Sequence, residues 1–219
     1  MEARTLSQGA LTNETRLQEL LDREELFDVV RRERLARDRR RFEQMRECFH
    51  EDAFVSTSWY HGTGADSYVE ATRKWMGNRQ PGTHWVFPAH AEICGDRATV
   101  ESSAMIASRP KLMDIEVDVE VICRFFSRAV KQDGRWKLLT FRVIFERDIM
   151  RPVNHSQILP IDQDVLATLR PSYKFIGYLQ TSRGVKLNSD HLGDDRPEEL
   201  EAFYAGERAW VRGGEPHAD

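Results

Sequence analysis

The sequence predicts an α+β fold in which helices come first and a mostly antiparallel sheet follows. Apolar residues recur at three- and four-residue steps between about residues 15 and 50, which is the period of a helix. After His84, four long segments rich in Val, Ile, Phe and Trp are joined by connections such as "CGD" and "KQDG", which are typical of hairpins. Beyond residue 150 the pattern becomes helical again.

The first helical segment begins near Thr15, and Asp22 is a candidate N-cap because acidic residues follow it in the next turn. A kink near Arg40 into a second short helix is expected. The stripe predicted to be buried consists of Phe27, Val30, Arg31, Leu35, Asp38, Phe42, Met45 and Phe49. Asp38 therefore places a carboxylate among residues that are predicted to be buried, and a buried carboxylate requires a partner.

A short strand is expected at residues 53–59, ending at Gly62 and Gly64, and a further helix covers "DSYVEATRKWM" up to Gly77. The four long strands are expected at about residues 84–94, 97–107, 115–128 and 135–149. Polar and apolar residues alternate only imperfectly along the last two. That pattern favours a sheet with helices on its concave side and a partner subunit on its convex side.

The tail shows two short helical pieces, "LPIDQDVLATLR" and "PSYKFIGYLQTSRG", and a closing helix after Asp195. The predicted organisation is a flexible arm at residues 1–14, an α+β domain at 15–150 and a C-terminal extension at 151–219. We expect the extension to pack on the domain or on a neighbouring subunit, over the mouth of a pocket.

The composition argues against several classes of function. The formal net charge of -4 and the absence of a clustered basic surface do not support nucleic-acid binding. Arg37, Arg39, Arg40 and Arg41 are interpreted as the solvated face of a helix end. No apolar run approaches the ~20 residues of a membrane span, and the polar start of the chain does not resemble a signal peptide. A cytoplasmic protein is expected.

Cysteine spacing and short motifs give no sign of a metal or cofactor. Cys48, Cys94 and Cys123 form no CxxC pair, and each lies in an apolar pattern, so buried free thiols are expected. There is no HExxH-like spacing, and "HGTGAD" lacks a full phosphate-binding fingerprint. No serine lies in a nucleophile elbow. We expect neither a metal nor a cofactor.

Three polar residues interrupt apolar patterns and are candidates for chemistry: Asp38, His84 and Arg142. A buried carboxylate is costly unless it is paired. A histidine is the most useful partner, because the carboxylate fixes its tautomer and leaves the second nitrogen as a general base. An arginine nearby could hold negative charge that develops on a substrate.

Each candidate also has a plainer interpretation. Asp38 could pair with Arg34 or Arg41 at the helix end. A single strand histidine is more often structural than catalytic. Arg142 could pair across the sheet with Glu120 or Glu146. The residues alone leave these alternatives open.

Together these segments resemble the nuclear transport factor 2-like superfamily, in its SnoaL-like branch. The resemblance covers about residues 15 to 150. It is carried by the phrases "LARDRRRFEQMRECFHEDAFV", "YHGTGADSYVEA", "GTHWV", "AEICGDRATVESSAMI" and "DGRWKLLTFRVIFERD".

The resemblance implies a cone-shaped fold in which a curved sheet wraps around the N-terminal helices and encloses an apolar pocket. Similar members include scytalone dehydratase, bile-acid dehydratase, hexachlorocyclohexane dehydrochlorinase, ketosteroid isomerase and polyketide cyclases. The aspartate and histidine of the elimination enzymes fall on Asp38 and His84, and the dehydrochlorinase arginine on Arg142. Tyr60 is a candidate by neighbourhood. This chain departs from the family in carrying Glu33 and Arg34 ahead of the aspartate, which adds charge near the pocket.

The resulting hypothesis is a cofactor-independent lyase or isomerase that acts on a hydrophobic, cyclic small molecule, with His84 as base and Asp38 orienting it. Arg142 or Tyr60 would assist the leaving group or enolate. The expected pocket residues are Phe54, Trp59, Trp85, Met105, Phe125 and Val143. The main alternative is a non-catalytic small-molecule-binding or assembly module on the same fold; an epoxide hydrolase is less supported. A homodimer or homotrimer is expected.

Overall fold

The computed structural model describes residues 12–77, 82–185, 187 and 190–215. Helix α1 (Asn13–Asp38) begins at Thr12, whose hydroxyl oxygen accepts a hydrogen bond from the backbone N–H of Thr15. Asp22 lies inside this helix, so its prediction as an N-cap is wrong; its carboxylate instead accepts hydrogen bonds from two side chains of the sheet. All but the last three residues of the predicted arm, residues 1–14, lie outside the described residues.

The buried stripe of α1 is rotated from the predicted one. Leu35, predicted to be buried, is 54% exposed. The expected kink is confirmed: Arg40 has a φ of 58°, and α2 (Phe42–Glu47) starts two residues later. The buried residues of α1 are Leu26, Val29, Val30, Glu33, Arg34, Ala36 and Arg37. Arg37 therefore belongs to the inner face of the helix and not to its solvated side.

The strands form one seven-stranded sheet with the order β2-β1-β7-β6-β4-β3, and β5 pairs with β6. Every pairing is antiparallel except that of β1 with β7, so the prediction of a mostly antiparallel sheet is confirmed. The first strand lies earlier than predicted. The strands are β1 (Phe49–Ser56), β2 (His61–Thr63), β3 (Thr83–Cys94), β4 (Arg97–Ser108), β5 (Lys111–Leu112), β6 (Ile115–Gln132) and β7 (Arg135–Pro152).

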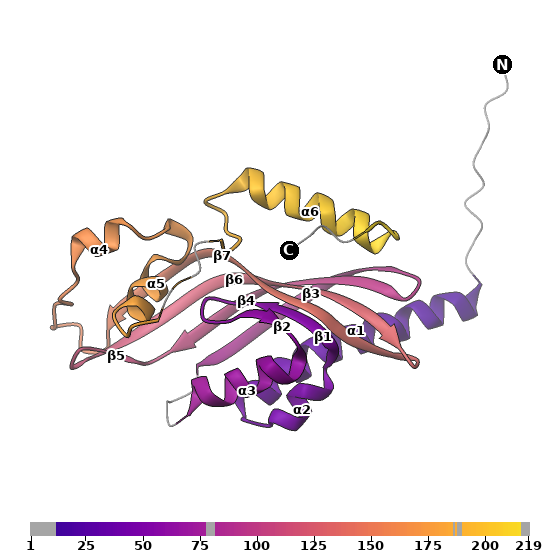
Figure 1. Ribbon diagram of the computed structural model, residues 1–219, viewed down its shortest axis with the longest axis horizontal. Coiled ribbons are helices and arrows are strands. Elements are labelled where there is room, and N and C mark those ends of the chain that lie inside the picture. Colours follow the sequence, from indigo (N-terminus) through magenta and orange to yellow (C-terminus); the bar gives the residue numbers. More distant parts are fainter. Residues whose placement is uncertain (1–11, 78–81, 186, 188–189, 216–219) are drawn as a thin grey trace, which may run out of the picture.

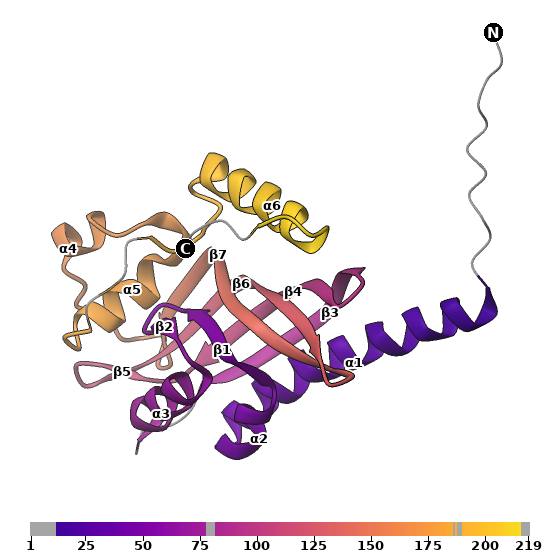
Figure 2. The same cartoon turned by 45° about the vertical axis from the view of Figure 1, so that its right-hand side comes forward.

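The sheet is strongly curved and does not close, as Figures 1 and 2 show. Register shifts interrupt the β3–β4 and β6–β7 pairings, and each such irregularity bends a strand locally. Helices α1, α2 and α3 (Ala65–Met76) lie on one side of it (Figure 1). This is the cone-like α+β architecture that the family resemblance implies.

The tail adds further helices to this domain. Helix α4 (Gln163–Ala167), the 3-10 turn η1 (Pro171–Tyr173) and α5 (Lys174–Thr181) lie at one end of the sheet, where η1 and α5 contact β7. Helix α6 (Pro197–Val211) lies across the opposite face of the sheet from α1–α3 (Figure 1). The tail therefore packs on both faces of the sheet.

Helix α6 explains why the last strands carry apolar residues of both parities. Phe125 and Val143 belong to the main core on the concave side, whereas Phe126 and Ile144 form a second cluster with Leu200 of α6. An element of the same chain covers this part of the convex face, so the mixed pattern does not require a partner subunit there.

Two of the three cysteines match the expectation. Cys48 and Cys123 are buried free thiols, whereas Cys94 at the end of the edge strand β3 is exposed, so its predicted burial is wrong. Burial raises the pKa of the Cys123 thiol to about 12. Within the described part of the chain, no helix is both long and apolar enough to cross a membrane.

The attachment of α6 gives a first prediction. Glu207 of α6 and Arg128 of β6 form a buried ion pair, with Nε–Oε2 and Nη2–Oε1 distances of 2.7 and 2.9 Å. Glu207→Ala leaves the arginine buried without its counter-charge, so the free energy of unfolding should fall by about 3 kcal/mol or more in urea titrations.

The matched control is Glu201→Ala on the same helix. Its ion pair with Arg208 is exposed to solvent, so this substitution should change the stability by less than about 1 kcal/mol. Equal losses in the two variants would contradict a structural role for the buried pair.

Candidate active site

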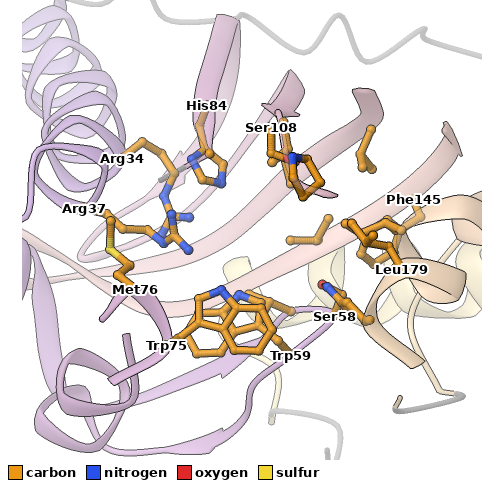
Figure 3. Close-up of a pocket in the computed structure, with 18 of the residues that line it drawn as sticks. Arg34, Arg37, Ser58, Trp59, Trp75, Met76, His84, Ser108, Phe145 and Leu179 are labelled. Atoms are coloured by element: carbon orange, nitrogen blue, oxygen red, sulfur yellow. The ribbon is translucent and has the colours of Figure 1, made fainter. Parts of the chain in front are cut away.

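A cavity of about 520 Å³ lies between the concave face of the sheet, α1, α3 and α5 (Figure 3). This volume is within the range of small-molecule sites. Ile176 and Leu179 of α5 form part of the wall, so the C-terminal extension helps to enclose the cavity. The other apolar and aromatic lining residues are Trp59, Tyr68, Trp75, Met76, Pro110, Ile106, Val121, Phe125, Val143 and Phe145.

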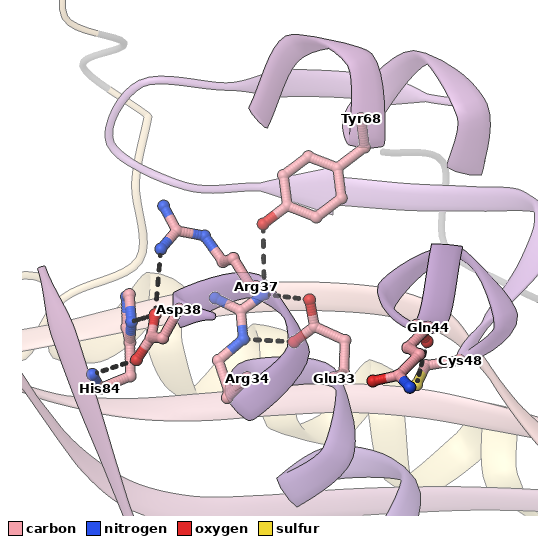
Figure 4. Close-up of polar contacts among 8 residues, drawn as sticks. All are labelled: Glu33, Arg34, Arg37, Asp38, Gln44, Cys48, Tyr68 and His84. Carbon is pink, nitrogen blue, oxygen red and sulfur yellow. Dashed lines mark hydrogen bonds and ion pairs between the residues drawn. The ribbon is translucent and has the colours of Figure 1, made fainter. Parts of the chain in front are cut away.

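Asp38 and His84 are in direct contact at the wall of this cavity (Figure 4). Asp38 is the last residue of α1, and His84 is the second residue of β3. The distance from His84 Nδ1 to Asp38 Oδ1 is 2.6 Å, and the backbone N–H of His84 donates to Asp38 Oδ2 over 2.7 Å. The side chains are only 6% and 12% exposed. One carboxylate therefore fixes both the strand and the ring.

This geometry selects one tautomer of the imidazole. Because a carboxylate oxygen accepts hydrogen bonds, Nδ1 of His84 carries the hydrogen and donates it to Asp38. Nε2 is then the nitrogen with a free lone pair. His84 lines the cavity, so Nε2 is the ring atom available to a bound molecule (Figure 3).

The electrostatics keep this ring neutral. Burial, followed by the positive charge of Arg37, lowers the pKa of His84 to about 4, although the hydrogen bond with Asp38 acts in the opposite direction. Burial acts to raise the pKa of Asp38, but the hydrogen bonds from His84 and the charge of Arg37 outweigh it, so this pKa is lowered. At neutral pH the pair is a carboxylate next to a neutral imidazole that can accept a proton.

A second buried ion pair lies one turn earlier on α1. Arg34 donates from Nε and Nη2 to the two carboxylate oxygens of Glu33, and Nη2 also donates to the hydroxyl of Tyr68 over 3.2 Å. The guanidinium lies over the ring of Phe141, 4.2 Å from its centroid. Arg34 and Tyr68 both line the cavity. Glu33 and Arg34 therefore lie near the pocket as expected, and their opposite charges neutralise each other.

Arg37 is the lining residue that the sequence interpretation placed wrongly. The sequence pattern predicts that Arg37 is solvated, but Arg37 is 6% exposed and lines the cavity beside the dyad. Its Nη1 makes one long contact of 3.4 Å with Asp38 Oδ1, and its guanidinium carbon lies 5.9 Å from the ring centroid of Trp59. Its Nε is buried without a hydrogen-bond partner among the described residues.

Of the six predicted pocket residues, Trp59, Phe125 and Val143 line the cavity, and Phe54, Trp85 and Met105 do not. Strand geometry explains why the prediction is wrong for Trp85 and Met105, because successive side chains point to opposite faces of a sheet. His84 and Ile106 face inward, so their neighbours Trp85 and Met105 face outward. Trp85 is 51% exposed.

Arg142 is also displaced from its predicted place. Val143 lines the cavity, so the adjacent Arg142 lies on the other face of β7, with its guanidinium 4.5 Å from the ring centroid of Phe54 and 5.8 Å from that of Phe203 on α6. Burial lowers its pKa to about 10. Arg142 therefore does not line the cavity in this structure.

Tyr60 does not line the cavity either. Its hydroxyl donates to Ser67 Oγ over 3.1 Å, and its ring lies 5.0 Å from that of Tyr68. Tyr68, on the inner face of α3, occupies the place expected for Tyr60. The amphipathic pattern of "DSYVEATRKWM" carries the signal that could have identified it, because Tyr68, Thr72 and Met76 recur at four-residue steps.

The described residues contain no group of three or more His, Cys, Asp or Glu side chains placed to hold a metal ion. The cavity lining itself contains one histidine, four arginines and no carboxylate within the described part of the chain. What the site offers is a base next to cationic and aromatic groups.

Comparison with known proteins identifies relatives along most of the chain. The profile of the SnoaL-like domain matches residues 18–142. An uncharacterised protein of Emericella nidulans is 30% identical over 210 residues, which cover 90% of this chain and 88% of that protein. Pea pathogenicity protein 2 of Fusarium vanettenii is 28% identical over 186 residues, covering 81% of this chain and 80% of the relative.

Among solved structures, the fold is similar to that of the hexachlorocyclohexane dehydrochlorinase LinA-type3 from Novosphingobium barchaimii. The TM-score is 0.56 with 14% sequence identity, and the match covers 67% of this chain and 99% of that protein. At this identity the likeness concerns the fold.

The charges around His84 predict how its titration responds to substitution. Arg37→Met removes a cation that disfavours the imidazolium, so the pKa of His84 should rise from about 4. Asp38→Asn removes a carboxylate that favours it, so the pKa should fall further. Nuclear magnetic resonance titration of ¹⁵N-labelled histidine measures both shifts and reports the tautomer directly.

Arg39→Met is the matched control, because it removes an exposed cation from the end of the same helix. It should leave the titration of His84 unchanged. A wild-type His84 that carries its hydrogen on Nε2, or that titrates equally in all four proteins, would contradict the assigned geometry.

Proposed function

The chain belongs to the family of SnoaL-like domains, and on this premise we propose that it is a cofactor-independent lyase or isomerase. The proposed reaction begins with removal of a proton from a hydrophobic, cyclic small molecule. The observation that carries the proposal is the double contact of Asp38 with the ring and backbone nitrogens of His84 at the wall of an apolar cavity.

His84 acts as the general base in this proposal. Its Nε2 takes a proton from a carbon next to an electron-withdrawing group, and the C–H bonding pair moves into a new carbon–carbon double bond or an enolate. In an elimination, a leaving group departs with its own bonding pair; in an isomerisation, His84 returns the proton to another carbon. Asp38 holds the ring in the required tautomer and stabilises the imidazolium that forms.

Tyr68 replaces the predicted Tyr60 and Arg142 as the assisting group. Its hydroxyl oxygen accepts a hydrogen bond from Arg34, which leaves its own hydrogen available to a leaving group or enolate oxygen in the cavity. The ion pair with Glu33 holds the Arg34 guanidinium in position. Arg34 therefore orients the tyrosine.

The dehydrochlorinase of similar fold supports the class of reaction, because a dehydrochlorination is an elimination. Fold likeness alone does not assign an activity. The support comes from a dyad and a cavity that meet at one place in this chain. That the protein is cytoplasmic and forms a homo-oligomer are predictions from the sequence.

The proposal is tested by proton exchange with solvent. The protein is incubated in D₂O with bicyclic ketone probes, 2-indanone and 2-tetralone, and deuterium uptake at the acidic carbon is followed by mass spectrometry. His84→Gln should lower the protein-catalysed rate about 100-fold or more, the usual contribution of a general base. Asp38→Asn should lower it as well, because the ring loses its orienting partner.

His90→Gln is the control, since His90 is an exposed histidine on the same strand. It should exchange at the wild-type rate. Full exchange in His84→Gln, with both variants folded, would defeat the proposal.

The same assay has a predicted pH dependence. The base must be neutral, and the pKa of His84 is lowered to about 4 in the folded protein. The rate should therefore hold constant as the pH falls from 7 through 6, and decline only as it approaches about 4. A decline centred near 6.5 would show that the base is not held in the environment described.

A further inference from the structure

The arginines of the cavity are unequally compensated. Arg34 is neutralised by Glu33 through two hydrogen bonds. Both oxygens of Asp38 are engaged at short range by His84, at 2.6 and 2.7 Å, so Arg37 shares this carboxylate only through a contact of 3.4 Å. Arg37 is thus the buried cation with the weakest counter-charge in the site.

Arg37 also has an unused hydrogen-bond donor. Nη1 makes the single long contact with Asp38, and Nε is buried without a partner among the described residues. Because Arg37 is only 6% exposed, bulk water solvates its side chain poorly. Such a group gains most from an anionic oxygen that supplies both charge and acceptors.

The position of Arg37 places that anion next to the base. Its Nη1 and Nδ1 of His84 contact the same carboxylate oxygen of Asp38, so the guanidinium and the imidazole are neighbours. Figure 3 shows both side chains at the same end of the cavity. A molecule bound through an anionic group on Arg37 would hold an adjacent C–H bond near Nε2 of His84.

The surroundings favour a flat ring attached to that anion. Trp59 lies beside Arg37 and stacks on Trp75 with a centroid distance of 4.9 Å and an interplanar angle of 13°. Phe125 lies 6.0 Å from the ring of His84. Arg183 and Arg109, the latter paired with Asp118 at 2.7 Å, also belong to the described lining, which contains no carboxylate. Such a lining attracts anions.

We propose that the substrate is an aromatic or cyclic carboxylate whose carboxylate group binds Arg37. This inference rests on the proposed function, because it names the class of molecule on which His84 acts. It makes Arg37 a residue that determines specificity and positions the substrate.

The test compares two probes of the same shape that differ in charge, 2-naphthoate and 2-naphthamide, by isothermal titration calorimetry on the full chain. The wild type should bind naphthoate about tenfold or more tightly than naphthamide, as expected for a charge-assisted hydrogen bond. Arg37→Gln should reduce this preference to about threefold or less. Arg37→Lys should retain part of it.

One further variant locates the effect. Arg39→Gln removes an exposed arginine of the same helix end and should keep the full preference. Thermal unfolding of Arg37→Gln checks that the variant is folded, and Arg37→Lys supplies the test if it is not.

The outcomes separate this inference from the function on which it rests. Equal binding of the two probes by the wild type, or no binding of either at millimolar concentration, overturns the assignment of a carboxylate even if His84→Gln abolishes proton exchange. A preference that depends on Arg37 supports it even if exchange proves independent of His84. In that case the cavity binds aromatic acids, and the proposed chemistry is wrong.

Discussion

The hydrogen bonds between Asp38 and His84 are the constraint on which the site depends. Asp38 ends α1, where the helix dipole disfavours a carboxylate, and it is also largely removed from water. Two donors from one residue of β3 offset both costs. Because one donor is a backbone N–H, the contact fixes the strand as well as the ring. It thereby ties the edge of the curved sheet to the helix that lies inside it.

Four charged residues of the site lie within the last two turns of α1. Glu33, Arg34, Arg37 and Asp38 are spaced so that side chains three and four residues apart share a face. Glu33 pairs with Arg34, and the neutral His84 engages both oxygens of Asp38 at short range, so Arg37 keeps only a contact of 3.4 Å with that carboxylate. At a solvent-exposed helix end, water would screen the interactions between these charges. Here the apolar surroundings screen them less, and the arginines among them contribute to the cationic lining of the cavity.

The sequence predicts the existence of the elements well and the direction of their side chains poorly. The hairpin turns at "CGD" and "KQDG" locate β3, β4, β6 and β7 to within a few residues. A buried carboxylate needs a partner, but the residues alone leave that partner open, and only the family resemblance assigns His84 to Asp38. The prediction of pocket residues is partly wrong because successive side chains of a strand point to opposite faces of the sheet. Arg142 and Val143 are adjacent on one strand, so the prediction that both face the cavity cannot hold for an extended strand. Arg37 was missed because an arginine among arginines is usually solvated. Only the tertiary packing of α1 shows which of them is buried.

Arg37 influences binding and base strength through the same charge. In the free protein, its field is one of the causes that lower the pKa of His84 to about 4, the others being burial and Arg34. A carboxylate bound to Arg37 would offset that field at short range, where the surroundings are apolar and interactions are weakly screened. The pKa of His84 would then rise, and the neutral imidazole would become a stronger base when an anionic molecule is present. Arg37 lowers the basicity of His84 when the cavity is empty. The basicity of His84 would thus depend on the charge of the molecule bound in the cavity.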